Sequence, residues 1–311
     1  MSTDPSTSKN KSMRIVAIIL TRDESIHIER CIRSLPEVIS EILVVDCGSN
    51  DDTVTKASRL GAKVIFHKWT NYASQFNWAL TQLNDDTDWV LRIDADEYLT
   101  LTLANEIKTY FCKLECNDVN GIFFSRRMTF QGQLIRYGGI FPVRVLRLFR
   151  FGCGECENRW MDEHIKVIGP TIEFNGELID DNLNSLTWWV DKHNKYASRE
   201  AVDLLNLEYG FMPHDSVANL RGGSQAGMKR WLKEVVYFRL PGGFRALVYF
   251  FYRYFVRCGF LDGTVGSTFH FLQGFWYRYL VDAKVAEVRR YIKKNGCGIQ
   301  EAIVKVLNIK V

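Results

Sequence analysis

The sequence predicts an α/β fold in which a mostly parallel sheet is flanked by helices. Three observations lead to this class. Short, continuous apolar runs are typical of strands covered on both faces. Segments with helical spacing of apolar residues separate these runs one by one. Strands joined by single helices form right-handed crossovers, and these build a parallel sheet. The chain's 311 residues, 47% hydrophobic and 24% charged, give ample length and composition for a globular core.

The elements of the first half follow in a regular order. The expected succession is strand 14–20, helix 25–35, strand 41–46, helix 52–60, strand 62–66, helix 72–83 and strand 88–94. Pro36 ends the first helix and Gly61 the second, because proline cannot continue a helix and glycine favours its C-terminal cap.

Composition divides the chain into three parts. Residues 1–12 are polar and lack the apolar core of a signal peptide, so we expect a disordered leader. Residues 13–215 form the predicted α/β domain. Residues 216–311 are basic and rich in aromatic residues, and are expected to be helical. Residues 1–220 hold 24 Lys and Arg against 31 Asp and Glu, whereas residues 221–311 hold 16 against 5.

Cysteine usage and hydropathy indicate the compartment. The eight cysteines lie at irregular spacings, which suits a reducing environment rather than a disulfide framework. No run reaches 18 uncharged apolar residues, so a membrane-spanning helix is not expected. We therefore expect a cytoplasmic protein, held peripherally at the inner face of the cell membrane by its basic tail.

Polar side chains follow three of the predicted strands. Thr21 and Glu24 follow the first, Asp46 ends the second, and Asp94 and Asp96 come at the end of the fourth. Because ligands bind beyond the carboxyl ends of parallel strands, these groups should surround one crevice. Neither a dinucleotide-binding glycine motif nor a phosphate-binding P-loop is present in the sequence.

The paired carboxylates at this edge favour a divalent cation. In an extended segment, Asp94 and Asp96 would point the same way, and their like charges call for a cation between them. Oxygen ligands favour Mg²⁺ or Mn²⁺, bridged to a substrate's phosphates. The alternative is a pair of solvated loop acids. Asp46 suits contact with a nucleobase N–H, and its alternative is a role in capping the next helix.

These residues carry a family resemblance. The segment from Ile42 to Asp51 (ILVVDCGSND), with Asp94-Ala-Asp96-Glu97 downstream, resembles the donor-binding half of inverting family 2 glycosyltransferases, which have the GT-A fold. The resemblance covers about residues 13–215. Residues 71–80, 160–164 and 187–197 resemble bacterial members that build lipopolysaccharide core, capsule or other surface glycans. Asp23 and Cys47 depart from the residues usual in such relatives.

The resemblance implies a reaction. A sugar would pass with inversion from a nucleotide-sugar donor, a UDP-sugar by default, to a hydroxyl of a lipid-linked or cell-surface glycan acceptor, with Mg²⁺ or Mn²⁺ present. Inverting transfer is a single displacement that needs one base, and Glu163, then Asp162, lie where relatives place it. The alternative for both is an ordinary surface turn.

The resemblance also assigns roles at the donor side. Asp46 would contact the base, Asp96 would be the main metal ligand, and Asp94 would lie nearer the ribose and the metal. His193 is a third candidate metal ligand, although a lone histidine is more often structural. Thr21, Glu24, Gln75 and Arg92 complete the predicted donor-binding residues.

Six arginines lie between residues 121 and 150. They are Arg126, Arg127, Arg136, Arg144, Arg147 and Arg150. Some of them suit binding of a diphosphate or of an anionic acceptor. The alternative for the segment 144–150 is an amphipathic strand with an exposed basic face.

The tail alternates aromatic and basic residues over positions 228–282. On short helices this composition favours an anionic membrane surface and argues against nucleic acid. The alternatives are a helical region that packs on itself and a homo-oligomer interface formed by the C-terminal helices. For the whole chain, the rival functions are a nucleotidyltransferase and a catalytically silent, membrane-associated scaffold that binds nucleotide sugars.

Overall fold

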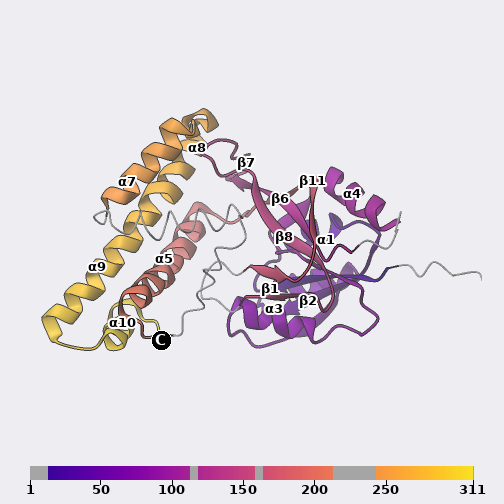
Figure 1. Cartoon of the computed structure of the whole chain (residues 1–311), viewed down its shortest axis with the longest axis horizontal. Coiled ribbons are helices and arrows are strands. Elements are labelled where there is room, and N and C mark those ends of the chain that lie inside the picture. The colour runs from indigo at the N-terminus through magenta and orange to yellow at the C-terminus, as the bar shows by residue number, and fades with distance from the viewer. Residues whose placement is uncertain (1–12, 113–117, 158–163, 213–242, 311) are drawn as a thin grey trace, which may run out of the picture. The chain divides into compact units, whose positions relative to one another are not determined.

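The computed structural model describes residues 13–112, 118–157, 164–212 and 243–310 (Figure 1). These residues form two compact units. The first takes the described residues within Met1–Arg126, Val143–Asn158 and Glu163–Asp181. The second takes those within Arg127–Pro142, Arg159–Asp162 and Asn182–Val311. The domain boundary predicted near residue 215 lies outside the described residues and stays a prediction.

The first unit is an α/β sandwich of a sheet and its covering helices. Its helices are α1 (Ile28–Arg33), α2 (Thr53–Arg59), α3 (Tyr72–Leu80) and α4 (Leu101–Cys112). Its strands are β1 (Ile15–Thr21), β2 (Ile39–Asp46), β3 (Lys63–Phe66), β4 (Trp89–Arg92), β5 (Glu97–Leu99), β6 (Gly121–Phe130), β8 (Val143–Arg150), β9 (Gly154–Cys156), β10 (Ile165–Val167) and β11 (Thr171–Asp180). The last residues of β6 pair with β7 (Gln133–Leu134) in the second unit. All seven predicted elements are present, so the α/β class is confirmed.

The sheet is parallel on one side and antiparallel on the other. Its order is β3-β2-β1-β4-β8-β6-β11-β5. Strands β3, β2, β1 and β4 run parallel, and Thr21 of β1 lies opposite Asp46 of β2. Strand β8 pairs antiparallel with both β4 and β6. The carboxyl ends of the parallel strands therefore meet at one edge, as predicted.

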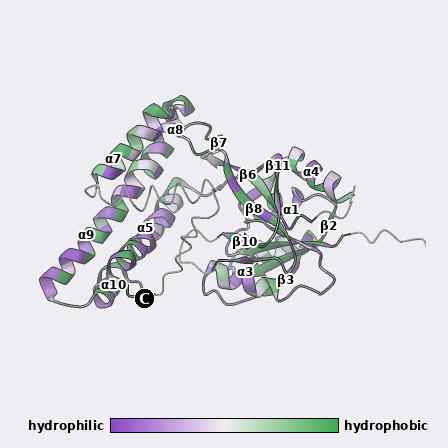
Figure 2. Ribbon diagram, in the orientation of Figure 1, coloured by the Kyte–Doolittle hydropathy of each residue, from purple (hydrophilic) through white to green (hydrophobic). Residues whose placement is uncertain are grey.

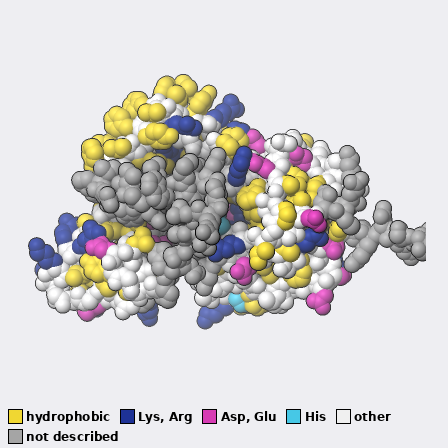
Figure 3. Space-filling view, in the orientation of Figure 1, with side chains coloured by type: hydrophobic (Ala, Val, Ile, Leu, Met, Phe, Trp, Pro, Cys, Tyr) yellow, Lys and Arg dark blue, Asp and Glu magenta, His cyan; other side chains and the backbone are white. Residues whose placement is uncertain are grey.

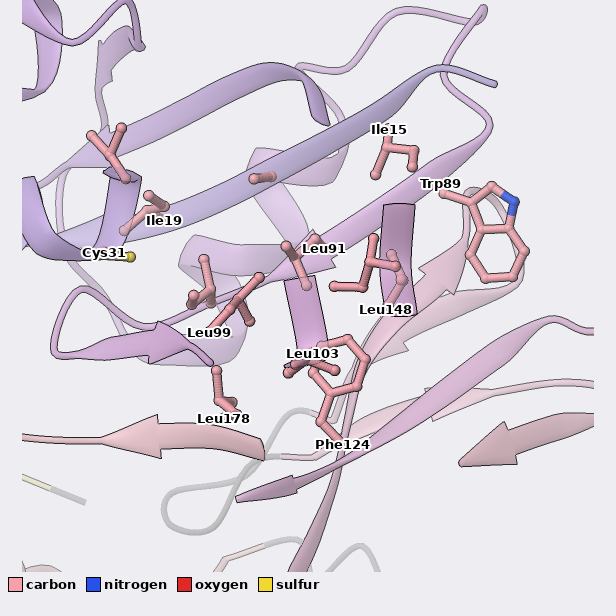
Figure 4. Packing of buried hydrophobic residues seen from close by; sticks show 14 of the residues in the cluster. Ile15, Ile19, Cys31, Trp89, Leu91, Leu99, Leu103, Phe124, Leu148 and Leu178 are labelled. Carbon is pink, nitrogen blue, oxygen red and sulfur yellow. The ribbon is translucent and has the colours of Figure 1, made fainter. Parts of the chain in front are cut away.

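Both faces of the sheet are covered, because β1 alternates between two cores. Ile15, Ala17 and Ile19 point to the face covered by α1, α2 and α4 (Figure 4). Val16 and Ile18 point to the opposite face, which α3 covers. A strand apolar at every position is the expected sequence for a parallel sheet buried on both faces.

The second unit is helical. It contains α5 (Leu186–Tyr209), α7 (Phe244–Phe251), the π-helical segment η2 (Tyr252–Val256), the 3₁₀ segment η3 (Gly259–Asp262), α8 (Gly263–Phe269), the π-helical segment η4 (His270–Trp276), α9 (Tyr277–Asn295) and α10 (Ile299–Leu307). Apolar side chains of α5, α9 and α10 form one core, and Figure 2 shows hydrophilic residues gathering toward the C-terminal end of α9. Within the described residues, no helix is both long and apolar enough to cross a bilayer.

Candidate active site

The ends of β1 and β2 form the first part of the site. The Thr21 hydroxyl donates to Asp46 Oδ1 over 3.1 Å, and the backbone N–H groups of Gly48 and Ser49 both donate to Asp46 Oδ2 over 2.8 Å. Asp46 is only 4% exposed. It does not cap α2, because the residue that accepts from the Thr53 N–H is Asp51. Asp46 instead shapes the loop that follows β2.

The loop after β1 is tied to the same region. Asn50 N–H donates to Asp23 Oδ1 over 2.7 Å, and Asp23 adopts a left-handed backbone with φ 56°. Glu24 N–H donates to the Thr53 hydroxyl over 2.8 Å, while the Glu24 carboxylate lies 2.6 Å from His27 Nδ1. Hydrogen bonds therefore join the loop after β1 to the loop after β2, and the Glu24 side chain contacts His27, the residue directly before α1.

Asp94 and Asp96 lie in a turn rather than in an extended strand. Strand β4 ends at Arg92, and the N–H of Glu97 donates to the carbonyl of Asp94 over 2.9 Å. The expectation that the strand runs to residue 94 was wrong, and so was the extended geometry that would align the two carboxylates. In a turn, the side chains of Asp94 and Asp96 need not point the same way. The contacts of each carboxylate are therefore considered separately.

Both carboxylate oxygens of Asp94 have partners. The Tyr72 hydroxyl donates to Oδ1 over 2.5 Å, and Arg147 Nη2 donates to Oδ2 over 2.9 Å. Burial alone would raise the pKa of Asp94, but the charges of Arg147 and Arg92 outweigh it and hold that pKa below its ordinary value. Asp94 is therefore an ionised carboxylate fixed in direction by two neighbours.

Arg147 joins Asp94 to a second, more deeply buried carboxylate. Its Nη2 also donates to Glu97 Oε1, and Glu97 and Arg147 are 1% and 3% exposed. Arg126 Nη1 lies 3.9 Å from the same Glu97 oxygen. Burial raises the pKa of Glu97 to about 7 against the lowering effect of Arg147, and the charge of Asp94 adds to the rise. An exposed basic face on β8 was thus the wrong alternative for Arg147.

The backbone of this turn is hydrogen-bonded to the residue that follows β11. The backbone carbonyl of Asp96 accepts from Asp181 N–H over 3.0 Å and from Arg30 Nη2 over 3.4 Å, and Arg30 also pairs with the Asp181 carboxylate. The Asp96 side chain is half-buried. Its backbone is anchored independently of its carboxylate.

Helix α3 organises the neighbouring predicted residues. The Arg92 side chain donates through Nε to the Tyr72 hydroxyl over 2.9 Å, and its guanidinium lies 4.3 Å above the Tyr72 ring. The Gln75 amide donates to the His67 carbonyl over 3.1 Å, and its oxygen lies 2.7 Å from His67 Nδ1. Arg92 and Gln75 are both buried, so each positions a neighbour: Tyr72 in one case and His67 in the other.

The same helix, α3, is hydrogen-bonded to β9, which precedes the predicted base in the sequence. Asn77 donates to the carbonyl of Cys156 and accepts from its N–H, each over 2.9 Å. This fixes β9, which pairs antiparallel with β10. Asp162 and Glu163 fall in the connection between these strands and lie outside the described residues. Their role as the base stays a prediction.

His193 lies on α5 in the second unit. Its Nδ1 donates to the Trp189 carbonyl over 2.8 Å, and the two rings stack with centroids 3.5 Å apart. Burial lowers the pKa of His193 to about 4, despite that hydrogen bond, so the imidazole is neutral at pH 7. A neutral imidazole can still ligate through Nε2. Its pairing with Asp94 and Asp96 stays a prediction.

The residues present fit a cation that a substrate helps to hold. No group of three or more His, Cys, Asp and Glu side chains is gathered for a metal in the part of the chain that the structure describes. Asp94 and Asp96 are the carboxylates that follow β4, and the assignment of Asp96 as the main metal ligand stays a prediction. Mg²⁺ and Mn²⁺ are commonly held by one or two carboxylates together with substrate phosphates and water.

Comparison with known proteins identifies the family. Residues 16–147 match the model of Glycosyl transferase family 2. An uncharacterised glycosyltransferase of Rickettsia prowazekii is 43% identical over 210 residues, which are 62% of this chain and 68% of that protein. The chain belongs to glycosyltransferase family 2. The prediction of family 2 is thereby confirmed, and the α/β sheet with its parallel strands agrees with the fold expected for the donor half.

Other matches are partial or distant. An uncharacterised glycosyltransferase of Rickettsia conorii is 43% identical to this family 2 glycosyltransferase over 33% of this chain. The matched part is 36%, about a third, of the length of that protein. A crystal structure of glucosyl-3-phosphoglycerate synthase from Mycobacterium tuberculosis with Mn²⁺, UDP and glucosyl-3-phosphoglycerate aligns with a TM-score of 0.30 and 20% identity. That alignment covers 38% of this chain and 44% of that one. So distant a likeness carries no inference about donor, metal or acceptor.

Sequence reasoning missed three residues of the site. Tyr72 was noticed only as part of a longer segment, Glu97 only as the neighbour of Asp96, and Arg147 only as one of six arginines. A signal for Arg147 exists in the spacing. Arg144 and Arg147 are three residues apart, and side chains at odd spacing point to opposite faces of a strand. One of the two therefore had to face inward.

Proposed function

We propose that this family 2 glycosyltransferase moves a sugar from a nucleotide-sugar donor, a UDP-sugar by preference, to a hydroxyl of an acceptor glycan, with inversion at the anomeric carbon. The observation that carries the proposal is the set of carboxylates at one edge of the parallel sheet: Asp46 after β2, and Asp94 and Asp96 after β4. Family membership supplies the class of reaction, and this edge is where an α/β sheet binds its ligand.

Each residue at the edge has a role that its contacts support. Asp46 would accept the N–H of the nucleobase, as the family resemblance implies, in addition to the Thr21 hydroxyl and the backbone N–H groups that it accepts in the loop. Tyr72 and Arg147 fix the direction of the Asp94 carboxylate. Asp94 is therefore better suited to accept a hydrogen bond from the ribose than to be the main metal ligand. Asp96 would then be the main ligand of Mg²⁺ or Mn²⁺. Glu24, Gln75 and Arg92 would shape the pocket through the neighbours that they position.

The chemical step needs a base. The acceptor hydroxyl oxygen forms a bond to the anomeric carbon, the bond from that carbon to the nucleoside diphosphate breaks, and the hydroxyl proton passes to a carboxylate. We propose Glu163, with Asp162 as the second candidate, for that carboxylate. The bound metal, when present, offsets the negative charge that develops on the leaving diphosphate.

The acceptor and location are proposed together. A lipid-linked or cell-surface glycan, as in lipopolysaccharide, capsule or exopolysaccharide synthesis, would be presented at the inner face of the cell membrane. The basic, aromatic-rich C-terminal part of the chain would keep the enzyme at that surface.

Nucleotide release from a panel of nucleotide sugars tests the donor site. The full chain would be assayed with Mn²⁺, with Mg²⁺ and with EDTA, in the presence of membrane lipid extract as a source of acceptor. Asp96→Ala should abolish release. Asp85→Ala is the matched control, since Asp85 is an exposed aspartate on the loop before β4 and should keep the wild-type rate.

The outcomes separate the rival functions. Metal-dependent release from one donor, lost in Asp96→Ala, would support the proposal and identify the sugar. Binding of a nucleotide sugar without release under any condition would favour the silent scaffold, and release of pyrophosphate from a nucleoside triphosphate would favour a nucleotidyltransferase. Glu163→Gln and Asp162→Asn, assayed in parallel, assign the base to the variant that keeps donor binding but loses transfer.

A further inference from the structure

An unusually apolar surface lies on the second unit. The exposed large apolar residues between positions 243 and 281, here called the hairpin face, are Phe244, Leu247, Val248, Phe251, Tyr252, Phe255, Val256, Phe260, Leu261, Phe271 and Tyr279. They come from α7, η2, η3, η4 and the start of α9. Figure 3 shows apolar side chains gathered where Figure 1 places α7 and α8. A contiguous apolar surface of this kind marks an interaction site.

The hairpin face is formed by two neighbouring helices. Along α7 and η2, exposed residues recur at helical spacing from Phe244 to Phe255, and the rings of Phe251 and Phe255 stack with centroids 5.1 Å apart. Phe250 bridges to the second helix, where its ring meets Phe271 at 6.1 Å. Phe275 continues that row to Tyr279 at 5.7 Å. The rings therefore form a continuous layer across both helices.

A buried polar network lies beneath this face. Arg253 and His270 are almost completely buried. Arg253 Nη2 donates to His270 Nδ1 over 3.3 Å, and His270 Nε2 donates to Asp262 Oδ2 over 3.2 Å. The Asp262 carboxylate also accepts the backbone N–H groups of Arg136 and Tyr137. This network lies beside buried apolar side chains such as Phe269 and Ala246, while many large aromatic side chains of the same stretch remain exposed.

Charge on this stretch is one-sided. Asp262 is the single acidic residue among positions 243–281, and it is buried. Arg245 is buried against Asp282, and Arg278 pairs with Glu200. Arg257 is exposed. The described stretch 243–281 thus carries one exposed cation, Arg257, and no exposed acid to repel an anionic surface.

We propose that the hairpin face inserts into the headgroup region of an anionic phospholipid leaflet. Its exposed Tyr residues and arginine suit a layer that is apolar below and polar above, and the polar network of Arg253, His270 and Asp262 holds the two helices together without using the outer aromatic residues. The absence of exposed acid among the described residues of this face favours anionic lipid over a protein partner, whose rim would be expected to offer charges of both signs. The proposal assigns a surface to the membrane association proposed above, and is independent of the donor chemistry.

Vesicle binding by the full chain tests this inference. Co-sedimentation would use vesicles of phosphatidylethanolamine and phosphatidylglycerol, with phosphatidylcholine vesicles for comparison. The double variant Phe251→Ser/Phe255→Ser removes two stacked rings that are 52% and 51% exposed. Apolar area of this size predicts a loss of vesicle affinity of about tenfold or more. The matched control is Leu101→Ser/Ile168→Ser, which removes residues of the first unit that are 85% and 84% exposed.

A variant that introduces a tryptophan tests the proposal by fluorescence, even if the double variant fails to fold. Phe251→Trp keeps an aromatic ring, and its emission should shift to the blue with anionic vesicles, whereas Leu101→Trp should not respond. Loss of binding in the hairpin variant alone, or a blue shift seen only with Phe251→Trp, supports the proposal. No vesicle binding by the wild type, equal loss in the control, or dimer dissociation by the double variant in size-exclusion chromatography without vesicle binding overturns it. Nucleotide release measured on the same variants with detergent-solubilised acceptor distinguishes failure here from failure of the glycosyltransferase proposal.

Discussion

The buried carboxyl group of Glu97 should make the first unit lose stability as the pH rises through neutrality. Its pKa is about 7 in the folded protein, against an ordinary value of 4.5. Between these values the folded protein holds a proton that the unfolded chain has released. The resulting stabilisation is complete below pH 4.5 and is lost as the pH rises through 7. The difference corresponds to about 3 kcal/mol, most of which is lost between pH 5 and 8.

Glu97→Gln isolates this contribution. Glutamine cannot titrate, and it can replace only one of the two acceptor roles of Glu97, toward Arg147 or toward the N–H of Asp94. That loss lowers the free energy of unfolding by about 1 kcal/mol at every pH. The wild type should therefore be the more stable protein at pH 5 by about 1 kcal/mol, and the order should reverse by pH 8, where Glu97→Gln should be the more stable by about 1–2 kcal/mol.

Urea unfolding followed by tryptophan fluorescence at pH 5, 6, 7 and 8 measures that difference. The pKa values of His193 and His270 in the second unit are lowered in the folded protein, so protonation of these histidines on unfolding also makes stability depend on pH. Only the comparison between wild type and variant is therefore informative. Glu106→Gln is the matched control, because Glu106 also accepts backbone N–H bonds, from Asn175 and Gly176, but lies outside the cluster. Parallel pH curves for the wild type and Glu97→Gln would refute the reasoning.

Two further substitutions test the site and the second unit. Tyr72→Phe removes the hydroxyl that donates to Asp94, and we expect about tenfold weaker UDP binding by calorimetry with about 1 kcal/mol lost in stability; unchanged affinity would contradict a positioning role for Tyr72. Gly138→Ala would place a Cβ 2.2 Å from the His270 ring, whereas Gly132→Ala, at nearly the same φ, meets open space. The first should cost about 1–3 kcal/mol more than the second in urea unfolding, and equal costs would show that the loop yields.

The fold could be predicted where the sequence pattern is compatible with only one type of secondary structure. Strand β1, and β2 from Ile42 onward, are apolar up to the polar residue that ends each strand, so their class, direction and burial follow from the pattern. The antiparallel half, β6, β8 and β11, mixes charged and apolar residues. Its pairing depends on contacts between residues far apart in the chain, which a local pattern does not encode.

The predictable part of the site is likewise limited to the ends of the parallel strands. Asp46, Asp94 and Asp96 were found because they interrupt apolar runs at a fixed place in the fold. Arg147 was not distinguished from its neighbours, because a buried arginine and a surface arginine look alike in sequence. The difference lies in its partners, which come from the turn after β4 and from the start of β5.

Buried arginine is the feature that both units share. In the first unit, Arg147 lies between Asp94 and Glu97. In the second, Arg253 contacts His270, which in turn contacts Asp262. An arginine at the centre of a buried polar network fixes several groups at once, because its planar guanidinium donates in more than one direction. In the first unit it orients a carboxylate toward the proposed donor. In the second it holds two helices together from within, so that the outer surface is left to aromatic residues, which suits the proposed attachment to a membrane.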